Sequence, residues 1–383
     1  MKVLWLAPFP HRSYAGHPAP WLTTLARALS RQPGFDLTVL NWEPALTQPV
    51  EEYEQDGIHF VYLKTPTTRQ DLLSLYRQRI ALTADYLRRY HREYDVIHVH
   101  GSELQYQAAV AGLDRPVLLS VQGIISECLR VLPETLSLRR VFWTLASYYE
   151  RKYVPGIHEF SCRTNWDKAQ VAKLSPGSRI HHNWEMIRPE FFAPVTEDSV
   201  PEGRPQILFM GGTQIMKGFH ETLQAFDAVC RQIPAKLVVV GEQDAEQVFR
   251  YVRQAGLHHI QHQDIECRGF QTAQQLRDVF AQSLCLLHPS YIDNSPNSVC
   301  EAQVAGLPVV ASQVGGVDSL IDDGHTGLLS SLRPQQLADQ VLRLHHAPDL
   351  SRRLAAQAQV VARTRHDPAT ILQRALDIYH VIQ

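Results

Sequence analysis

Residues 283–329 read SLCLLHPSYIDNSPNSVCEAQVAGLPVVASQVGGVDSLIDDGHTGLL. A short apolar run over 283–288 ends at a polar loop, and the pattern beyond the loop predicts a helix over about 297–305. Gly306 ends that helix, and Pro308 opens another apolar run, which predicts a second strand. A strand, a helix and a strand in this order predict a parallel sheet with helices on its faces, the doubly wound α/β class.

The same alternation runs along the whole chain. Short apolar runs that lack polar alternation predict parallel strands buried on both faces. Helices are predicted over 20–31, 69–94, 273–281, 332–346 and 350–365. Six strands are predicted in each half of the chain, at 3–7, 36–40, 59–63, 96–100, 117–121 and 158–162, and then at 206–210, 236–240, 260–265, 283–288, 308–311 and 327–329.

A break separates the two halves. The segment 185–205 holds four prolines and no helical period, which predicts an interdomain linker. We therefore expect two Rossmann-like domains that face a central cleft, residues 1–190 and residues 191–367, because each is long enough to hold its own core. A last helix over 368–383 is expected to cross back to the first domain.

Composition and charge exclude several classes of protein. The 383 residues carry a net charge of −2, and a near-neutral chain is not a bulk nucleic-acid binder, which needs surplus positive charge. The six cysteines form no C-x-x-C pair, so a structural zinc site is not expected. No apolar run approaches the ~18 residues that span a membrane. We expect a cytoplasmic protein with reduced thiols.

Two carboxylates lie at the predicted strand–loop–helix junction. Asp293 stands in the loop and Glu301 lies about one turn inside the helix. The start of a helix offers backbone N–H groups and the positive end of the helix dipole, which favour an anion. One carboxylate can reach sugar hydroxyls at the loop while the other reaches a ribose near the helix. The junction also holds polar residues, of which the last two are suited to cap the helix: Asn294, Ser295, Asn297 and Ser298.

This segment resembles the signature of the retaining glycosyltransferases of family 4, which have the two-domain GT-B fold. The family pattern runs Pro-Ser, Glu-x7-Glu, Ala-x-x-x-Gly-x-Pro-Val-Val and Gly-Gly. Here it reads Pro289-Ser290, Asp293 through Glu301, Ala302, Gly306, Pro308-Val309-Val310 and Gly315-Gly316. The resemblance implies that Glu301 binds the donor ribose and that Asp293 faces the donor sugar, with one methylene less than the family's first glutamate.

A second stretch, ILFMGGTQIMKG over 207–218, predicts a strand that runs into a glycine-rich turn before the next helix. It resembles the family's diphosphate site, in which Lys217 matches the lysine that neutralises the leaving nucleoside diphosphate. The family's arginine is absent, because Gly211 and Gly212 stand at its place. The resemblance then implies that Lys217, the helix dipole and Thr213 stabilise the diphosphate, or that an arginine from elsewhere substitutes.

Three further blocks resemble the family. Gly16 and His17 stand where the family has Gly-Gly near the donor phosphate and the acceptor. Gln122 stands where the family has a histidine that contacts the donor sugar; an amide can hydrogen-bond a hydroxyl but cannot take a proton. The block that presents backbone groups to the nucleobase is matched by Arg268, Gly269 and Phe270.

The resemblance implies a retaining hexosyltransferase that moves a sugar from a UDP- or GDP-linked donor to a hydroxyl acceptor in bacterial surface-polysaccharide or glycoconjugate synthesis. No Asp-x-Asp stands at a strand end, so neither a metal nor another cofactor is expected. The departures at Asp293, Gln122 and the missing arginine leave open a degenerate nucleotide-sugar-binding subunit that assists a partner. A GT-B sugar-nucleotide epimerase is disfavoured because the signature is so complete.

The stretch 137–154 has apolar residues at helical spacing beside four basic ones. Such a pattern is typical of a helix that lies on an anionic membrane, and also of one that packs on its own domain. We expect the packed arrangement, and peripheral contact with the inner face of the membrane remains the alternative. The basic residues are Arg139, Arg140, Arg151 and Lys152.

Overall fold

The computed structural model of the protein describes residues 1–14, 19–193 and 203–383. The predicted phosphate- and acceptor-side residues Gly16 and His17 lie outside these residues, as does much of the predicted linker. The fold and the candidate site are therefore built from the remaining elements.

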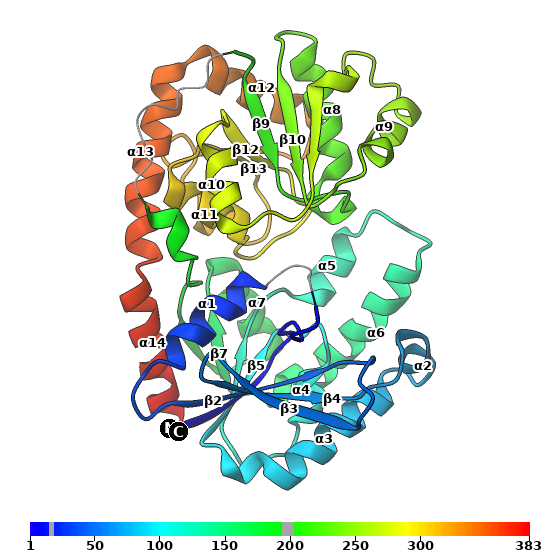
Figure 1. Ribbon diagram of the computed structural model, residues 1–383, viewed down its shortest axis with the longest axis vertical. Helices are drawn as coiled ribbons and strands as arrows, with labels where there is room; N and C mark the ends of the chain where they lie inside the picture. Colours follow the sequence, from blue (N-terminus) through cyan, green and yellow to red (C-terminus); the bar gives the residue numbers. More distant parts are fainter. Residues whose placement is uncertain (15–18, 194–202) are drawn as a thin grey trace. The chain divides into compact units, whose positions relative to one another are not determined.

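The chain forms two compact units. The first consists of residues 1–186 together with 368–383, and the second of residues 187–367. Each unit has one parallel or largely parallel sheet between helices, which confirms the doubly wound α/β class (Figure 1). The units divide between Met186 and Ile187, where the sequence placed the boundary at 190/191, and the last helix belongs to the first unit.

The first unit has an eight-stranded sheet of order β3-β4-β2-β1-β5-β6-β7-β8, in which β3 alone among the described strands runs antiparallel to its neighbour. Its strands are β1 (Lys2–Leu6), β2 (Asp36–Trp42), β3 (Val50–Gln55), β4 (Ile58–Leu63), β5 (Val96–His100), β6 (Val117–Ser120), β7 (Glu159–Cys162) and β8 (Arg179–His182). Its helices are α1 (Pro20–Leu29), α2 (Thr68–Leu73), α3 (Arg77–Tyr90), α4 (Tyr106–Ala109), α5 (Ile125–Val131), α6 (Leu138–Tyr153), α7 (Asn165–Leu174) and α14 (Pro368–Ile382).

Three predictions for this unit were incomplete. The strands β3 and β8 were missed because they are polar and mostly half-buried or exposed, and so lack the buried apolar run that predicts a strand. The single helix predicted over 69–94 is two helices, α2 and α3. The backbone of Leu75 and Tyr76 between them is left-handed, with φ of 53° and 63°, and such a conformation interrupts a right-handed helix.

The two faces of the first sheet bury separate clusters. Trp5 and Leu4 are neighbours on β1 and point to opposite faces, as strand geometry requires. The Trp5 face is covered by α1 and α14, and the indole N–H of Trp5 donates to the hydroxyl of Tyr379 on α14 at 2.9 Å. The Leu4 face packs on α3 and α4. The C-terminal helix is therefore part of the core of the first unit.

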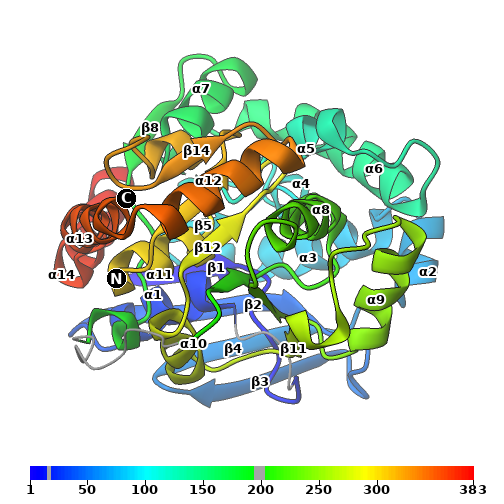
Figure 2. The ribbon, with the colours of Figure 1, turned by 90° about the horizontal axis from the view of Figure 1, so that it is seen from above.

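The second unit has a six-stranded parallel sheet of order β11-β10-β9-β12-β13-β14. Helices α8 and α12 pack against each other on one face (Figure 2), and α11 packs against α13. Its strands are β9 (Gln206–Phe209), β10 (Lys236–Val240), β11 (Ile265–Arg268), β12 (Cys285–His288), β13 (Val309–Ser312) and β14 (Leu328–Ser330). Its helices are α8 (Phe219–Cys230), α9 (Ala245–Gln254), α10 (Ala273–Ala281), α11 (Asn297–Ala305), α12 (Pro334–His346) and α13 (Pro348–Arg365).

The sequence placed α10 and α11 correctly at both ends. The strand predicted over 260–265 was wrong, because β11 begins only at Ile265. Residues His262–Asp264 form a 3₁₀ turn instead, and the Asp264 carboxylate accepts the backbone N–H of Gln261 at 2.7 Å. An Asp bonded back to the backbone in this way favours a turn over a strand.

Candidate active site

The carboxyl ends of β11, β10, β9 and β12 lie side by side in the second sheet, which is the edge where open parallel sheets bind ligands. Backbone hydrogen bonds join the turns that follow these strands. The N–H of Gly212, after β9, donates to the carbonyl of Val240 at 3.0 Å. The N–H of Gly241, after β10, donates to the carbonyl of Arg268 at 2.9 Å. The turns therefore form one continuous rim.

Two glycines bring further segments onto the loop after β12. A Cβ atom on Gly218, whose φ is +78°, would lie 1.8 Å from the carbonyl oxygen of Pro289. A Cβ atom on Gly315, whose φ is +56°, would lie 2.0 Å from the carbonyl oxygen of Asp293, and the N–H of Gly316 donates to that oxygen at 2.9 Å. Only glycine permits both approaches. The Lys-Gly turn and the Gly-Gly turn thus fix the backbone around Asp293 from two sides.

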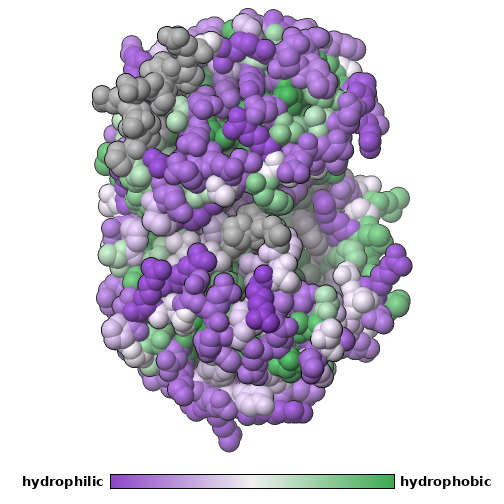
Figure 3. Space-filling view, in the orientation of Figure 1, coloured by the Kyte–Doolittle hydropathy of each residue, from purple (hydrophilic) through white to green (hydrophobic). Residues whose placement is uncertain are grey.

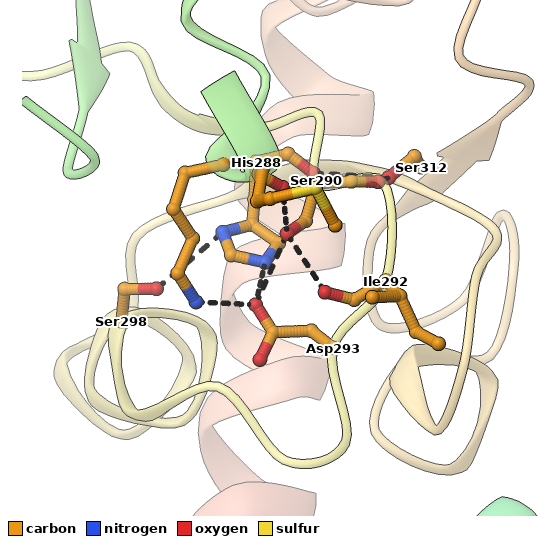
Figure 4. A network of polar contacts seen from close by, with 8 residues as sticks. His288, Ser290, Ile292, Asp293, Ser298 and Ser312 are labelled. Atoms are coloured by element: carbon orange, nitrogen blue, oxygen red, sulfur yellow. Dashed lines mark hydrogen bonds and ion pairs between the residues drawn. The ribbon is translucent and has the colours of Figure 1, made fainter. Parts of the chain in front are cut away.

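Asp293 is the centre of a polar network (Figure 4). Its Oδ2 atom lies 2.7 Å from Nζ of Lys217 and 3.2 Å from Nε2 of His288, and it accepts the hydroxyl of Ser290 at 3.2 Å. Since a carboxylate only accepts, Nε2 of His288 carries a proton, and Nδ1 lies 3.5 Å from the hydroxyl of Ser298. Asp293 and Lys217, both predicted to be catalytic, are therefore in direct contact.

The charge state of Asp293 follows from these contacts. Its side chain is only 15% exposed, and burial by itself raises the pKa of a carboxyl group. The positive charge of Lys217 and the hydrogen bond from His288 outweigh burial, so the pKa of Asp293 lies well below its usual range. Asp293 is ionised at neutral pH. All three contacts converge on Oδ2, whereas Oδ1 takes part in none of them.

Glu301, on α11, is paired with an arginine that the sequence did not identify. The side chain of Glu301 is buried, with 2% of the residue exposed, and its Oε1 atom lies 2.9 Å from Nε and 2.8 Å from the terminal nitrogen of Arg188. The guanidinium of Arg188 also lies 4.9 Å from the ring centre of Phe191. The missed signal was a glutamate between the apolar residues Val299 and Val304 of the helix, because a buried carboxylate requires a cation.

The start of α11 differs from the prediction. Pro296 is the N-cap residue, so Asn297 and Ser298 lie in the first helical turn and no side chain caps the helix. The hydroxyl of Ser298 instead reaches His288, and Oδ1 of Asn297 is buried without a hydrogen-bond partner among the described residues. Asn294 and Ser295 are buried residues of the loop itself. Neither Asn297 nor Ser298 therefore caps the helix as predicted.

The other predicted donor residues lie along the rim. The hydroxyl of Thr213 donates to Glu242 at 3.3 Å, which ties the turn after β9 to the turn after β10. Arg268 ends β11 and its Nε donates to Glu266 at 2.5 Å. Gly269 is needed because a Cβ atom there would lie 2.4 Å from the side-chain nitrogen of Gln243. Phe270 projects into solvent with 62% of its surface exposed.

Gln122 belongs to the other unit and follows β6. Its amide nitrogen is buried without a hydrogen-bond partner in the part of the chain that the structure describes. Among the described residues, no group of three His, Cys, Asp or Glu side chains could hold a metal ion. No helix within those residues is long and apolar enough to span a bilayer.

A family model matches the second unit of the chain, and known proteins are similar to the chain over both units. Residues 196–361 match the family model of glycosyl transferases group 1. The chain is 26% identical to the D-inositol 3-phosphate glycosyltransferase of Pseudarthrobacter chlorophenolicus over 91% of this chain and 88% of that protein.

Two solved structures share the fold. The sucrose-phosphate synthase of Thermosynechococcus elongatus superposes with a TM-score of 0.80 at 15% identity, over 99% of this chain and 98% of that one. HepE of Anabaena, in complex with UDP and glucose, superposes with a TM-score of 0.69 at 17% identity, over 98% of each chain. At these identities the likeness shows the fold.

Proposed function

We propose that the protein moves a hexose, with retention, from a UDP- or GDP-linked donor to a hydroxyl acceptor, because its second unit matches the family model of glycosyl transferases group 1 and the chain has the GT-B fold. The known setting of such enzymes extends the proposal to bacterial surface-polysaccharide or glycoconjugate synthesis. The HepE structure holds UDP and glucose, and the curated relative acts on an inositol phosphate by name; both support a nucleotide-sugar donor and a hydroxyl acceptor.

The observation that carries the proposal is the contact between Lys217 and Asp293 on the glycine-lined rim. A donor diphosphate offers oxygens that compete with the Asp293 carboxylate for the ammonium of Lys217. When the diphosphate binds the ammonium of Lys217, Oδ2 of Asp293 loses its strongest partner. His288 and Ser290 still hold the Asp293 carboxylate in place. The carboxylate is then oriented to accept a hydrogen bond from a sugar hydroxyl.

In this reaction the bond between the anomeric carbon and the diphosphate oxygen breaks, and a bond from that carbon to the acceptor oxygen forms. The proton of the acceptor hydroxyl passes to the departing diphosphate, on which negative charge develops. A positioned cation stabilises that charge most strongly in the transition state. Lys217 supplies it from a turn whose backbone is fixed by Gly218 against Pro289. Glu301, held by Arg188, is assigned to the ribose hydroxyls. Orientation of the two substrates supplies much of the remaining rate.

A transfer assay with UDP-, GDP- and ADP-hexoses and a set of methyl hexosides and myo-inositol as acceptors tests the proposal. We expect release of one nucleoside diphosphate that depends on the acceptor, and a product with the anomeric configuration of the donor. Lys236→Ala is the matched control for Lys217→Ala, because Lys236 lies on the same sheet but pairs with Glu266. Nucleotide binding without turnover would instead support the degenerate-subunit alternative.

The proposal includes transfer without a resident metal ion. The chain lacks an Asp-x-Asp motif at a strand end, and the charge of Lys217 takes the place that a cation would otherwise hold on the diphosphate. Transfer by protein treated with excess EDTA should match transfer in added Mg²⁺ or Mn²⁺. Activity that disappears with EDTA and returns with a divalent ion would overturn this part of the proposal.

One face of α6 supports peripheral contact with an anionic membrane. The helix buries Ala146 and Tyr149 within its own unit, as expected. Its other face and the preceding loop expose apolar residues, which Figure 3 shows as green atoms at the right-hand edge, where Figure 1 places α5 and α6. The exposed apolar residues are Leu136, Leu138, Val141 and Tyr148, and Arg151 and Lys152 at the end of the helix are exposed cations.

Cosedimentation with vesicles of phosphatidylcholine, with and without phosphatidylglycerol, tests this contact. We expect binding only to the anionic vesicles, weakened by salt and by Leu138→Ser with Val141→Ser. Leu73→Ser is the control, because Leu73 is a leucine on α2 that is even more exposed than Leu138. Equal binding to both vesicle types, or to neither, would contradict the proposed membrane contact.

A further inference from the structure

The loop that follows β5 in the first unit is braced from three elements. The hydroxyl of Ser102 donates to Glu150, on α6, at 2.9 Å. The amide of Gln107 donates to the carbonyl of Ser102 at 2.9 Å. Gln105 donates to the carbonyl of Glu103 at 2.6 Å and accepts in turn from Arg79, on α3. The backbone of this loop is therefore fixed, and the side chain of Glu103 starts from a rigid position.

The carboxylate of Glu103 lies across the ends of two neighbouring strands. A Cβ atom on Gly101, after β5, would lie 2.1 Å from its Oε2, and a Cβ atom on Gly123, after β6, would lie 3.0 Å from its Oε1. Two glycines thus make the space that this one carboxylate occupies. It is half-buried at the carboxyl edge of the sheet, where a ligand can reach it.

A second polar group at the same edge lacks a partner. Gln122 comes between β6 and Gly123, and its Cγ lies 3.3 Å from the Cβ position of Gly101, the same position that Glu103 contacts. Its amide nitrogen is buried, and within the described residues no acceptor satisfies it. A buried donor of this kind costs about 1–3 kcal/mol when it stays unpaired. An acceptor carboxylate and an unpaired donor amide are therefore presented side by side.

The charges around Glu103 decide its protonation. Burial is the largest influence and raises the pKa of Glu103 to about 7; the carboxylate of Glu150, from α6, raises it as well. The backbone N–H groups of Glu103 and Gly123 and the guanidinium of Arg163, which follows β7, lower it. Gln122 is neutral. Glu103 is thus an acid that titrates near neutral pH. The carboxylate of Glu150 accepts hydrogen bonds from the hydroxyl of Ser102 and from the backbone N–H groups of Ile125 and Ser126.

We infer that Glu103 and Gln122 together form the subsite for a hydroxyl-bearing acceptor. The carboxylate of Glu103 accepts a hydrogen bond from a hydroxyl of the acceptor substrate. The amide of Gln122 donates a hydrogen bond to an oxygen of the same molecule. The acceptor class is a polyhydroxylated ring, such as a hexoside or a cyclitol, because adjacent hydroxyls present a donor and an acceptor at once. This inference rests on the proposed transfer function and adds the residues that select its acceptor.

The experiment measures transfer from UDP-hexose or GDP-hexose, whichever the chain uses, to methyl hexosides and myo-inositol between pH 5.5 and 8.5. Because the ionised carboxylate is the stronger acceptor, we expect the acceptor KM to fall as pH rises through about 7. Glu103→Gln should raise the acceptor KM about tenfold or more and abolish its pH dependence. The donor KM should stay within about twofold. Glu103→Asp should restore part of the pH dependence.

Glu127→Gln is the matched control. Glu127 lies on α5, directly after Ser126, whose N–H donates to Glu150, and its carboxylate pairs only with Arg130 among the described residues. Its removal changes the charge of the same region without touching the subsite, so its kinetics should match the wild type.

Three results would overturn the inference. An unchanged acceptor KM in Glu103→Gln would show that the carboxylate does not bind the acceptor. A change confined to the donor KM would place the pair on the donor sugar. Absence of transfer by the wild-type chain would overturn the proposed function and this inference together, whereas the first two results leave the proposed function standing. Far-ultraviolet circular dichroism of each variant confirms that it is folded.

Discussion

Nζ of Lys217 lies 2.7 Å from Oδ2 of Asp293, although the two residues are 76 positions apart in the sequence. The contact requires two strand ends to be adjacent, a glycine at 218 and a glycine at 315. It gives Lys217 an anionic partner that a diphosphate can replace. The pair therefore connects the fold of the second unit to the proposed chemistry of the donor.

Lys217→Ala should lower kcat/KM for the donor about 100-fold, because one positioned charge on the leaving group is lost. Lys217→Arg should retain more activity than Lys217→Ala, since it keeps the charge. Initial rates with the active donor measure both. Lys236→Ala should behave as wild type, and an equal loss in that control would mean that the effect comes from net charge rather than from position.

Asp293→Asn should separate binding of the nucleotide from transfer. The variant keeps the shape of the side chain and removes the charge that competes for Lys217, so the affinity for the nucleoside diphosphate should stay equal or rise. The transfer rate should fall, since the amide oxygen of Asn is a weaker hydrogen-bond acceptor for a hydroxyl of the donor sugar than the carboxylate is. Calorimetry and initial rates measure the two effects, and a parallel loss of both would contradict the division of roles between Lys217 and Asp293.

The pair of Glu301 and Arg188 should be strongly coupled. Both side chains are largely buried, so removal of one partner leaves an uncompensated charge and costs about 3–5 kcal/mol of unfolding free energy. Glu301→Gln and Arg188→Met should each destabilise the protein, and the double variant should be less destabilised than the sum. Urea denaturation of the four proteins measures the coupling. Additive effects would show that the pair contributes nothing beyond its separate parts.

Glu103 should make stability depend on pH. Its pKa is about 7 in the folded protein and about 4.5 in an unfolded chain, so the folded state holds the proton over this interval while the unfolded state has lost it. The unfolding free energy should therefore fall as pH rises from 4.5 to 7, by roughly 2 kcal/mol relative to Glu103→Gln. Denaturation curves of both proteins at several pH values test this. Identical pH profiles would mean that Glu103 titrates in the ordinary range.

Tyr379→Phe should weaken the attachment of α14 to the first unit. The Tyr379 hydroxyl accepts from Trp5 at 2.9 Å and lies 2.7 Å from Nδ1 of His98, both buried. Burial lowers the pKa of His98 to about 3, so the ring is neutral and loses a partner when the hydroxyl is removed. A loss of about 1–3 kcal/mol is expected from thermal or urea unfolding. Tyr148→Phe, on an exposed side chain, should change little.

The sequence predicted those parts of the fold whose signal is local. The bounds of α10 and α11 were correct because a helix period and a terminal glycine or cap lie within the segment itself. The strands β3 and β8 were missed because polar edge strands derive their order from pairing with a neighbour rather than from their own composition.

The candidate site was predictable only in part for a related reason. A motif identified Lys217, Asp293 and Glu301, but not the partner that each finds in space. Arg188 lies 113 positions before Glu301, in a segment that reads as a linker. Glu103 looks like an ordinary loop residue until Gly101 and Gly123 are seen to make room for it. Contacts across such separations depend on the whole sheet, and no spacing in the sequence encodes them.

The most direct test of the central claim is calorimetric titration of the wild-type protein and of Lys217→Ala with UDP, GDP and ADP. The account predicts that one of UDP and GDP binds the wild-type protein with micromolar affinity, and that Lys217→Ala binds it at least about tenfold more weakly, equivalent to about 1.4 kcal/mol. Absence of binding by every nucleotide, or equal binding by the variant, would contradict the assignment of the diphosphate to Lys217.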